Sequence, residues 1–354
     1  MEERKIILEA KDIIVKFRVR ERTLTAIRNV SLKLYEGETL AIVGESGSGK
    51  SVFTKTFTGM LETNGEINNG EIIFEGKNLL ENKTDADWVK IRGKKIATVF
   101  QDPMTSLNPV RTIGSQIAEV IIKHQGLSKA EAKKQAIDLM TRVGIANAEK
   151  RYDEYPFMYS GGMRQRIVIA ITLACRPKIL ICDEPTTALD VTIQAQIIEL
   201  IKELSKEFKF TTIYITHDLG VVANVADRVA VMYAGQIIEE GSVEEIFYEP
   251  AHPYTWGLLS SLPQLGEKGE ELYAIEGTPP SLFEEIKGDA FAPRNPYAMK
   301  IDFEMEPPIF KISETHYAKT WLLDERAPKV EKPKAIRNLH EKLLRLYSKE
   351  VSNG

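Results

Sequence analysis

The chain carries an eight-residue segment whose composition and spacing suit the binding of phosphate groups. The segment fits the pattern GxxxxGK[ST] and consists of Gly44, Glu45, Ser46, Gly47, Ser48, Gly49, Lys50 and Ser51. Glycines at these positions let backbone N–H groups turn toward phosphate oxygens, and a following helix N-terminus adds partial positive charge. We expect Lys50 to reach the β- and γ-phosphates of a nucleotide and the Ser51 hydroxyl to bind Mg²⁺.

Two adjacent carboxylates, Asp183 and Glu184, lie at the end of the apolar run KILICDEP at 178–185. A carboxylate at the end of a buried strand can hold Mg²⁺ through water, and we assign this role to Asp183. We expect Glu184 to point at the γ-phosphate and to polarise the attacking water as a general base. The pair therefore predicts hydrolysis of the bound nucleotide.

A Ser-Gly-Gly turn forms a second candidate anion site at Ser160, Gly161 and Gly162, shortly before an apolar helix that includes Ile167. Small residues at a helix start leave backbone N–H groups free to bind an anion. The chain already has one phosphate loop at 44–51. A second anion site in the same chain is explained if each ATP is bound by the phosphate loop of one subunit and the Ser-Gly-Gly turn of another.

Short apolar runs alternate with helical periodicity along the first 250 residues. This pattern predicts an α/β fold with a mostly parallel sheet; its strands are expected at 38–43, 95–100, 178–182, 211–215 and 228–233. The first 35 residues alternate polar and apolar side chains, which predicts an antiparallel edge. Residues 102–175 lie between the second and third strands and have helical periodicity, so we interpret them as an inserted helical subdomain.

Prolines cluster after about residue 250 and regular periodicity fades. We therefore divide the chain into a nucleotide-binding domain at 1–250 and a C-terminal extension at 251–354. A final amphipathic helix is expected at roughly 335–348, either docked on the extension or lying on a membrane surface.

Composition excludes several other classes of protein. The net charge of -4 and the pI near 5.9 argue against a nucleic-acid partner. The two cysteines, Cys175 and Cys182, lie in apolar runs, which indicates buried thiols in a reducing compartment. The charged N-terminal segment is unlike a secretory signal, and no apolar run approaches the 18 residues or more of a spanning helix.

In order and spacing, these motifs resemble the ABC ATPase family over roughly residues 5–250. The resemblance adds a glutamine after a strand (Gln101), the loop ending at Asp190, and His217 after the strand TTIYIT. It implies that Gln101 contacts Mg²⁺ and the γ-phosphate, that Asp190 belongs to the nucleotide site and that His217 meets charge on the γ-phosphate. The usual first leucine of the signature is Tyr159 here, a departure that leaves the Ser-Gly-Gly turn intact.

Further segments resemble the ATPases of oligopeptide and dipeptide permeases, and their D-type subunit most closely. They are FQDPMTSLNP at 100–109, SGGMRQR at 160–166, DEPTTALDVTIQAQI at 183–197, HPYT at 252–255 and LLSSLP at 258–263. The resemblance implies an ATP-hydrolysing subunit, peripheral on the cytoplasmic face of the membrane, that energises peptide import. The implied partners are two transmembrane permease subunits, a second ATPase subunit in a heterodimer or homodimer, and indirectly an extracellular peptide-binding protein. Phe17 is the candidate adenine-stacking residue, with an ordinary core phenylalanine as the alternative.

The extension departs from many relatives, which carry an iron–sulfur cluster on cysteines in a GCxFxxRCxxAxxxC pattern followed by a later cysteine. The frame survives at 288–302, but the cysteine positions hold Asp289, Asn295, Asp302 and, later in the chain, Thr320. None of these side chains replaces a thiolate ligand of iron, so we predict no iron–sulfur cluster. Asp289 and Asp302 are interpreted as polar loop residues, with a hard-cation site as the alternative.

Two other ATPase classes fit less well. A DNA-repair ATPase of the same superfamily would need a long coiled-coil insertion, whereas only 132 residues separate Lys50 from Asp183. A ribosome-acting translation ATPase would typically carry two cassettes and basic linkers, and this chain has one cassette and net negative charge.

Overall fold

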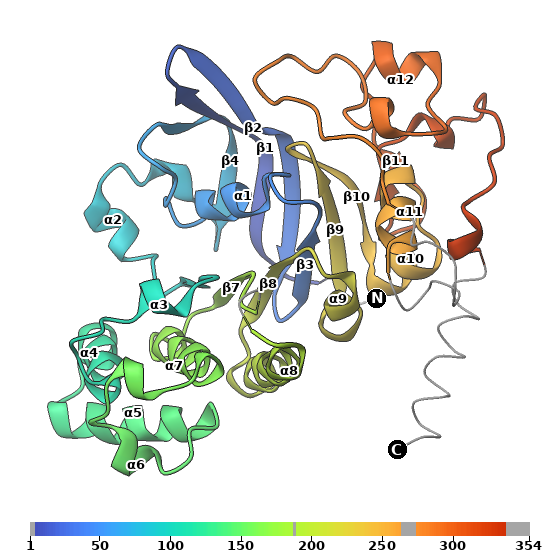
Figure 1. The fold of residues 1–354 in the computed structure, drawn as a ribbon. Helices are drawn as coiled ribbons and strands as arrows, with labels where there is room; N and C mark the ends of the chain where they lie inside the picture. The colour runs from blue at the N-terminus through green and yellow to red at the C-terminus, as the bar shows by residue number, and fades with distance from the viewer. Residues whose placement is uncertain (1–3, 187–188, 263–273, 338–354) are drawn as a thin grey trace, which may run out of the picture.

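Two β-sheets form the centre of the computed structural model, which describes residues 4–186, 189–262 and 274–337 (Figure 1). The larger sheet has eight strands in the order β11-β12-β10-β9-β3-β8-β7-β6. These are β3 (Thr39–Val43), β6 (Ile96–Val99), β7 (Ile179–Asp183), β8 (Thr211–Thr216), β9 (Arg228–Tyr233), β10 (Gln236–Ser242), β11 (Phe310–Lys311) and β12 (Tyr317–Ala318). The predicted strands of the α/β core are confirmed to within two residues at each end.

Five adjacent strands of this sheet, β9, β3, β8, β7 and β6, run parallel to one another, and β6 is at the edge. In the aligned register, Val43 faces Thr216 and Asp183 faces Ile215. Because parallel strands end at the same edge, the loops after β3, β6, β7 and β8 leave the sheet side by side.

The second sheet is antiparallel and has the strand order β2-β1-β4-β5. Its strands are β1 (Ile6–Val19), β2 (Arg22–Tyr35), β4 (Gly65–Phe74) and β5 (Lys77–Asn78). The antiparallel pairing predicted for the first 35 residues is confirmed, but these strands form a sheet of their own. Apolar side chains of β1, β2 and β4 cover one face of the parallel strands, together with Phe53 of helix α1 (Lys50–Thr56) and Phe57, the residue just after it.

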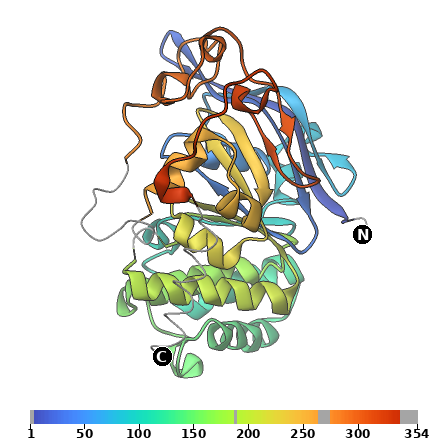
Figure 2. The same ribbon diagram turned by 90° about the vertical axis from the view of Figure 1, so that its right-hand side faces the viewer.

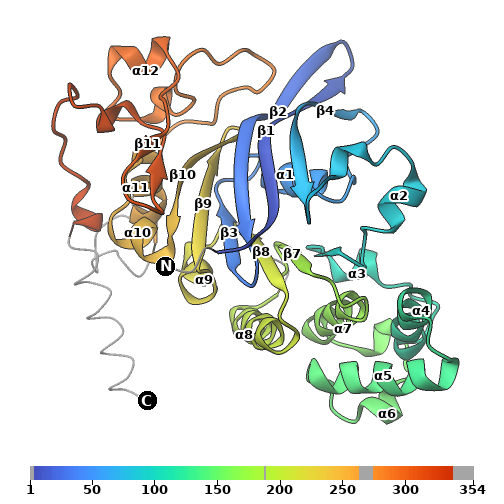
Figure 3. The same ribbon diagram turned by 180° about the vertical axis from the view of Figure 1, so that it is seen from behind.

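Helices predominate between β6 and β7, as the helical periodicity predicted (Figure 3). They are α3 (Pro103–Ser106), α4 (Ile113–Gln125), α5 (Lys129–Arg142), α6 (Ala148–Arg151) and α7 (Gly161–Leu173). A capping box opens α5, since the Ser128 side chain accepts from the Glu131 N–H and the Glu131 carboxylate accepts from the Ser128 N–H. A short helix, α2 (Asp85–Val89), precedes β6.

The other face of the large sheet packs against helices α7 and α8 (Val191–Phe208) and against α9 (Leu219–Val225) (Figure 2). The side chains of β3 show how one strand serves both faces: Leu40 and Ile42 lie in the cluster with the antiparallel sheet, whereas Ala41 and Val43 lie in the cluster with α9. This alternation follows from the two-residue period of a strand.

The C-terminal extension packs directly on the cassette at the side opposite the helical subdomain (Figures 1 and 3). Its helices are α11 (Pro253–Ser260) and α12 (Lys300–Glu304), its strand β12 pairs with β10, and α10 (Val243–Tyr248) comes just before the extension in the chain. Tyr254 and Phe291 share a buried cluster with Val231 of β9. The domain boundary near residue 250 is therefore crossed by a continuous hydrophobic cluster. Nearly all of the helix predicted at 335–348 lies outside the described residues.

Within the described residues, no helix is long and apolar enough to cross a membrane.

One buried ion pair joins the two sheets at the start of the parallel strands. The side chains of Glu38, just before β3, and Arg228, at the start of β9, are each 5% exposed, and Arg228 Nη1 lies 3.1 and 3.0 Å from the two carboxylate oxygens. Arg228 also donates to the carbonyl of Lys33 in β2 and lies over the Tyr35 ring. Arg228 thus connects β9 with the antiparallel sheet.

Replacing Arg228 with leucine should lower the free energy of unfolding by about 3–5 kcal/mol, because the Glu38 carboxylate would stay buried without its partner. Equilibrium urea unfolding of the full chain measures this loss. The matched control is Arg111→Leu, which removes a half-exposed pair with Glu119 and should cost less than about 1 kcal/mol. A loss no larger than that of the control would contradict the linking role of Arg228.

Candidate nucleotide-binding and hydrolysis site

The predicted phosphate loop connects β3 to α1, as the strand–loop–helix context requires. Gly44 has a φ of 149°, and a Cβ there would lie 2.1 Å from the carbonyl oxygen of Met232. Gly49 has a φ of 103° and would place a Cβ 2.9 Å from the carbonyl oxygen of Ala26. Both positions therefore require glycine, because the loop lies directly against neighbouring backbone.

Lys50 is buried beneath this loop, with a residue exposure of 5%. Its Nζ donates to the carbonyl oxygens of Gly44 and Glu45 at 2.8 Å each and contacts the Ser48 hydroxyl at 3.4 Å. Burial lowers the pKa of Lys50, although the nearby carboxylates of Glu184 and Asp183 act in the opposite direction. A phosphate oxygen in the loop would supply the anionic partner that favours the charged amine.

Ser51 and Asp183, which are both expected to bind Mg²⁺, lie next to each other in the structure. The Ser51 hydroxyl donates to Asp183 Oδ1 at 2.8 Å across the gap between α1 and the end of β7. Burial raises the pKa of Asp183, which a bound cation would reverse. A hydroxyl and a carboxylate oxygen are ligands that Mg²⁺ accepts, with its remaining positions filled by water and nucleotide phosphates. The residues present therefore fit the ion.

Glu184 lies at the centre of the three predicted catalytic side chains. Its carboxylate lies 3.5 Å from the Gln101 amide nitrogen and 3.4 Å from His217 Nδ1. These residues follow β7, β6 and β8, so the aligned strand ends bring them together. Glu184 has a φ of 48°, an uncommon conformation for glutamate, and its N–H donates to the Ile215 carbonyl at 3.0 Å. That turn directs the carboxylate toward its two neighbours.

The Ser-Gly-Gly turn lies in the helical subdomain, where Ser160 is the N-cap of α7 and accepts from the Met163 N–H at 3.4 Å. Ser160 and Gly161 are exposed. A Cβ at Gly162 would lie 2.5 Å from the Ile193 side chain of α8. Figures 1 and 3 both place the start of α7 apart from α1, so the two predicted anion sites do not meet in one chain. Tyr159 is buried beneath the turn, and its hydroxyl donates to the Arg151 carbonyl.

Asp190 and Phe17 have local roles in the structure. Asp190 is the N-cap of α8, and its carboxylate accepts from the Ile193 N–H at 3.0 Å. Phe17 is only 8% exposed, and a Cβ at Gly65 would lie 2.4 Å from its ring. This burial supports the alternative of a core phenylalanine, and adenine stacking stays a prediction. Thr187, in the loop before Asp190, lies outside the described residues.

Sequence reasoning missed two residues of the extension that touch the loop. The Arg294 guanidinium binds the Glu45 carboxylate, and the Tyr254 hydroxyl accepts from the Glu45 N–H at 2.9 Å. Tyr254 lies in the HPYT segment, and Arg294 lies in the 288–302 frame. Both segments stood out in the sequence, but nothing in either indicated a contact with Glu45.

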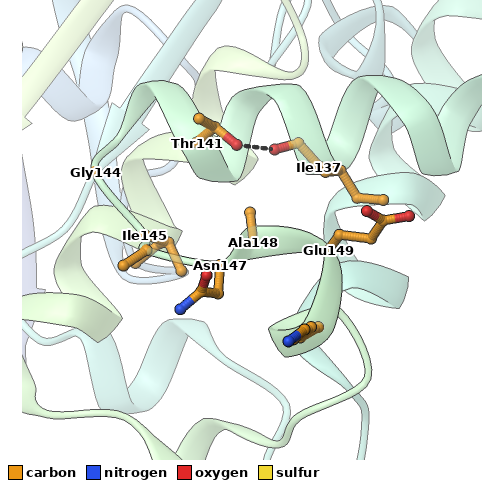
Figure 4. A pocket seen from close by; sticks show the side chains of 9 residues that line it. Ile137, Thr141, Gly144, Ile145, Asn147, Ala148 and Glu149 are labelled. Atoms are coloured by element: carbon orange, nitrogen blue, oxygen red, sulfur yellow. Dashed lines mark hydrogen bonds between the residues drawn. The ribbon is translucent and has the colours of Figure 1, made fainter.

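A pocket in the helical subdomain lies away from these residues. Its lining comes entirely from α5, α6 and the loop between them, and includes Ile137, Thr141, Asn147 and Glu149 (Figure 4). The Thr141 hydroxyl donates to the Ile137 carbonyl within its own helix. The pocket is lined by none of the residues predicted to bind or hydrolyse the nucleotide.

Comparison with known proteins adds independent evidence. The family described as ABC transporter matches residues 27–187, and the family described as oligopeptide/dipeptide transporter, C-terminal region, matches residues 238–301. The chain is 67% identical to the oligopeptide transport ATP-binding protein AmiE of Streptococcus pneumoniae, covering 96% of each chain. It is 57% identical to the oligopeptide transport ATP-binding protein OppD of Bacillus subtilis, covering 98% of this chain and 97% of that one.

The chain belongs to the ATP-binding subunits of ABC-type oligopeptide and dipeptide transporters.

A solved structure places the cassette in the same fold. A dimeric ATP-binding cassette in a post-hydrolysis state, bound to ADP and phosphate, aligns with a TM-score of 0.59 at 29% identity. The alignment covers 67% of this chain and 98% of the other. The extension thus accounts for much of the chain that this structure leaves unmatched.

The four positions where many relatives carry cysteines hold buried polar residues in this ATP-binding subunit. Asp289, Asn295, Asp302 and Thr320 are each at most 7% exposed. A side-chain oxygen of each accepts a backbone N–H, from Phe291, Tyr297, Met299 and Leu322 respectively. These oxygens thus stabilise local turns. The donor set does not fit an iron–sulfur cluster, which is held by thiolates. Asp289 lies in a loop, as the sequence interpretation has it, whereas Asp302 lies in α12, and the surrounding extension encloses both side chains.

Replacing Glu184 with glutamine should retain ATP binding and lower single-turnover hydrolysis at this site at least ~10²-fold, because an amide does not polarise water as a carboxylate does. Turnover is measured in the assembled transporter, with ATP binding measured in parallel. The matched control is Glu203→Gln on α8, which lies outside the predicted site. Near-normal turnover by Glu184→Gln at its own phosphate loop would refute the assignment of the general base.

Proposed function

We propose that this ATPase subunit binds ATP with Mg²⁺ and that its hydrolysis energises the import of oligopeptides through partner membrane subunits. The observation that carries the proposal is the convergence of Lys50, the Ser51–Asp183 pair and Glu184 at one edge of the parallel sheet. The names of the relatives, which match along nearly the whole chain, support oligopeptides as the cargo.

The chain's own residues divide the work of hydrolysis. Lys50 holds the transferred phosphate by charge, and Ser51 with Asp183 would hold Mg²⁺, which neutralises phosphate charge when bound. Glu184 orients and polarises the attacking water and takes its proton as the new P–O bond forms and the bond from the γ-phosphorus to the ADP leaving group breaks. Gln101 and His217 flank the Glu184 carboxylate, which supports a role for their polar groups beside the attacking water and the γ-phosphate.

A second ATPase subunit would complete each nucleotide site. Ser160, Gly161 and Gly162 lie at the start of α7 in the helical subdomain, and Figures 1 and 3 draw α7 apart from α1, which supports contact with ATP held by a partner. The dimeric state of the related cassette supports the same arrangement. We propose a heterodimer with a sibling ATPase as the working assembly, and a homodimer as the alternative. ATP binding would close the two cassettes, and hydrolysis would reopen them.

The wider assembly follows from the names of the relatives. As a subunit of a peptide transporter, the chain would bind two transmembrane permease subunits at the cytoplasmic face of the membrane. An extracellular peptide-binding protein would deliver the cargo without touching this chain. No iron–sulfur cluster is proposed, because the side-chain oxygens at its usual positions already accept backbone N–H groups.

Uptake by a reconstituted transporter tests the proposed cargo. Proteoliposomes that contain this chain with its copurifying membrane subunits should accumulate a radiolabelled oligopeptide only when ATP is present on this chain's side. The Glu184→Gln transporter is the control and should lose at least ~10²-fold of the uptake rate. Normal ATP hydrolysis that never drives peptide accumulation would reject oligopeptides as the cargo and leave the ATPase assignment intact.

Metal analysis tests the absence of the cluster. Protein purified anaerobically should contain no stoichiometric iron or acid-labile sulfide and should show no brown absorbance, since no thiolates occupy the four positions. A positive control carries Asp289→Cys, Asn295→Cys, Asp302→Cys and Thr320→Cys and is treated with iron and sulfide under the same conditions. About four irons per chain in the unaltered protein would overturn the proposal.

A further inference from the structure

The extension makes direct contact with the phosphate loop at one residue, Glu45. Arg294 Nη1 lies 2.7 Å from Glu45 Oε2, and Nη2 lies 2.9 Å from Oε1. This is the paired geometry in which a guanidinium binds a carboxylate most strongly. The Arg294 side chain is 5% exposed and the Glu45 side chain 28% exposed, so the guanidinium is enclosed and the carboxylate is partly open to water.

Arg294 is itself held in place by the extension and by the end of β9. Its Nε donates to the Glu276 carbonyl at 2.9 Å, and Nη1 also donates to the Tyr233 hydroxyl at 3.2 Å. The guanidinium carbon lies 5.7 Å from the centre of the Tyr233 ring and 6.0 Å from the centre of the Phe291 ring. The guanidinium therefore presents a fixed orientation to Glu45.

A second contact reaches the backbone of the same loop residue. The Tyr254 hydroxyl accepts from the Glu45 N–H at 2.9 Å, and Tyr254 is fully buried. Its ring packs on Tyr233 at 4.6 Å and on Phe291 at 5.3 Å. Both the carboxylate and the N–H of Glu45 therefore form hydrogen bonds with side chains of the extension.

The remaining backbone group of Glu45 faces the phosphate-binding lysine. Its carbonyl oxygen accepts from Lys50 Nζ at 2.8 Å. A chain of contacts consequently runs from the extension through Glu45 to Lys50. A change in the Arg294 or Tyr254 contact would alter the position of the carbonyl on which the lysine rests.

We propose that the C-terminal extension sets the conformation of the phosphate loop, with Arg294 and Tyr254 as positioning residues that act through Glu45. The extension is then part of the nucleotide site without touching the nucleotide. It also neutralises a carboxylate that would otherwise stand beside the phosphates and repel them. The inference rests on ATP binding by this loop and is independent of the cargo.

Nucleotide titration of the isolated full-length chain tests the proposal. Arg294→Met should raise the Kd for MgATP about 10-fold, the effect of losing a charge-assisted bond at the loop. Tyr254→Phe removes only the hydroxyl and should raise the Kd less. In the assembled transporter, Arg294→Met should raise the KM for ATP while kcat at saturating ATP stays within about twofold, because Arg294 touches no reacting atom.

Two further variants separate positioning from folding. Arg326→Met removes an arginine of the extension that pairs with Asp324 in solvent, and it should leave the Kd unchanged. Arg294→Lys keeps the charge without the paired geometry and should recover part of the affinity. If Arg294→Met does not fold, Glu45→Gln serves in its place, since it removes the charge that Arg294 binds. An unchanged Kd in the folded variant, or a fall in kcat with KM unaltered, would overturn the proposal.

Discussion

Backbone hydrogen bonds between parallel strands hold the ends of β3, β6, β7 and β8 at one edge of the sheet. The pairing of Val43 with Thr216 and of Asp183 with Ile215 leaves little freedom in where the following residues begin. Gly44, Glu184 and His217 each lie within one residue of a strand end. The site therefore depends on strand register more than on any single side-chain contact, because a slip of one residue would reverse the direction of the side chains.

The phosphate loop is held from several sides by the rest of the chain. The close approach of Gly44 to the Met232 carbonyl excludes any larger side chain. The Gly235 N–H donates to the Ser48 carbonyl at 2.9 Å, and the extension binds Glu45. These contacts hold a buried lysine in place, with the carbonyl oxygens of Gly44 and Glu45 as its hydrogen-bond acceptors at 2.8 Å, so a bound phosphate would neutralise a charge that folding has already desolvated.

The parts of the chain that pack together are not the same as the parts that are expected to share a nucleotide. The extension shares a buried cluster with β9 and reaches the phosphate loop, so it forms one unit with the cassette. The helical subdomain shares a core with the parallel sheet, yet its Ser-Gly-Gly turn is set apart from the loop of its own chain. This arrangement supports the proposal that a second subunit completes each nucleotide site.

The sequence by itself determined the family, the strand and helix order and the residues at the strand ends. Those features have local causes: the loop needs glycines where the backbone turns sharply, strands and helices carry their own periodicity, and Ser128 with Glu131 caps a helix within four residues. Glu184, Gln101 and His217 could be predicted together because each follows a parallel strand.

Only the tertiary structure decided the contacts between distant segments. Glu45 and Arg294 are 249 positions apart, and Glu38 and Arg228 are 190 apart. No periodicity or capping rule relates such pairs, since their meeting depends on how whole elements pack. The same reason applies to Phe17 and Asp289: their residue types allowed exposed or buried roles, and the neighbouring elements decided that both are enclosed.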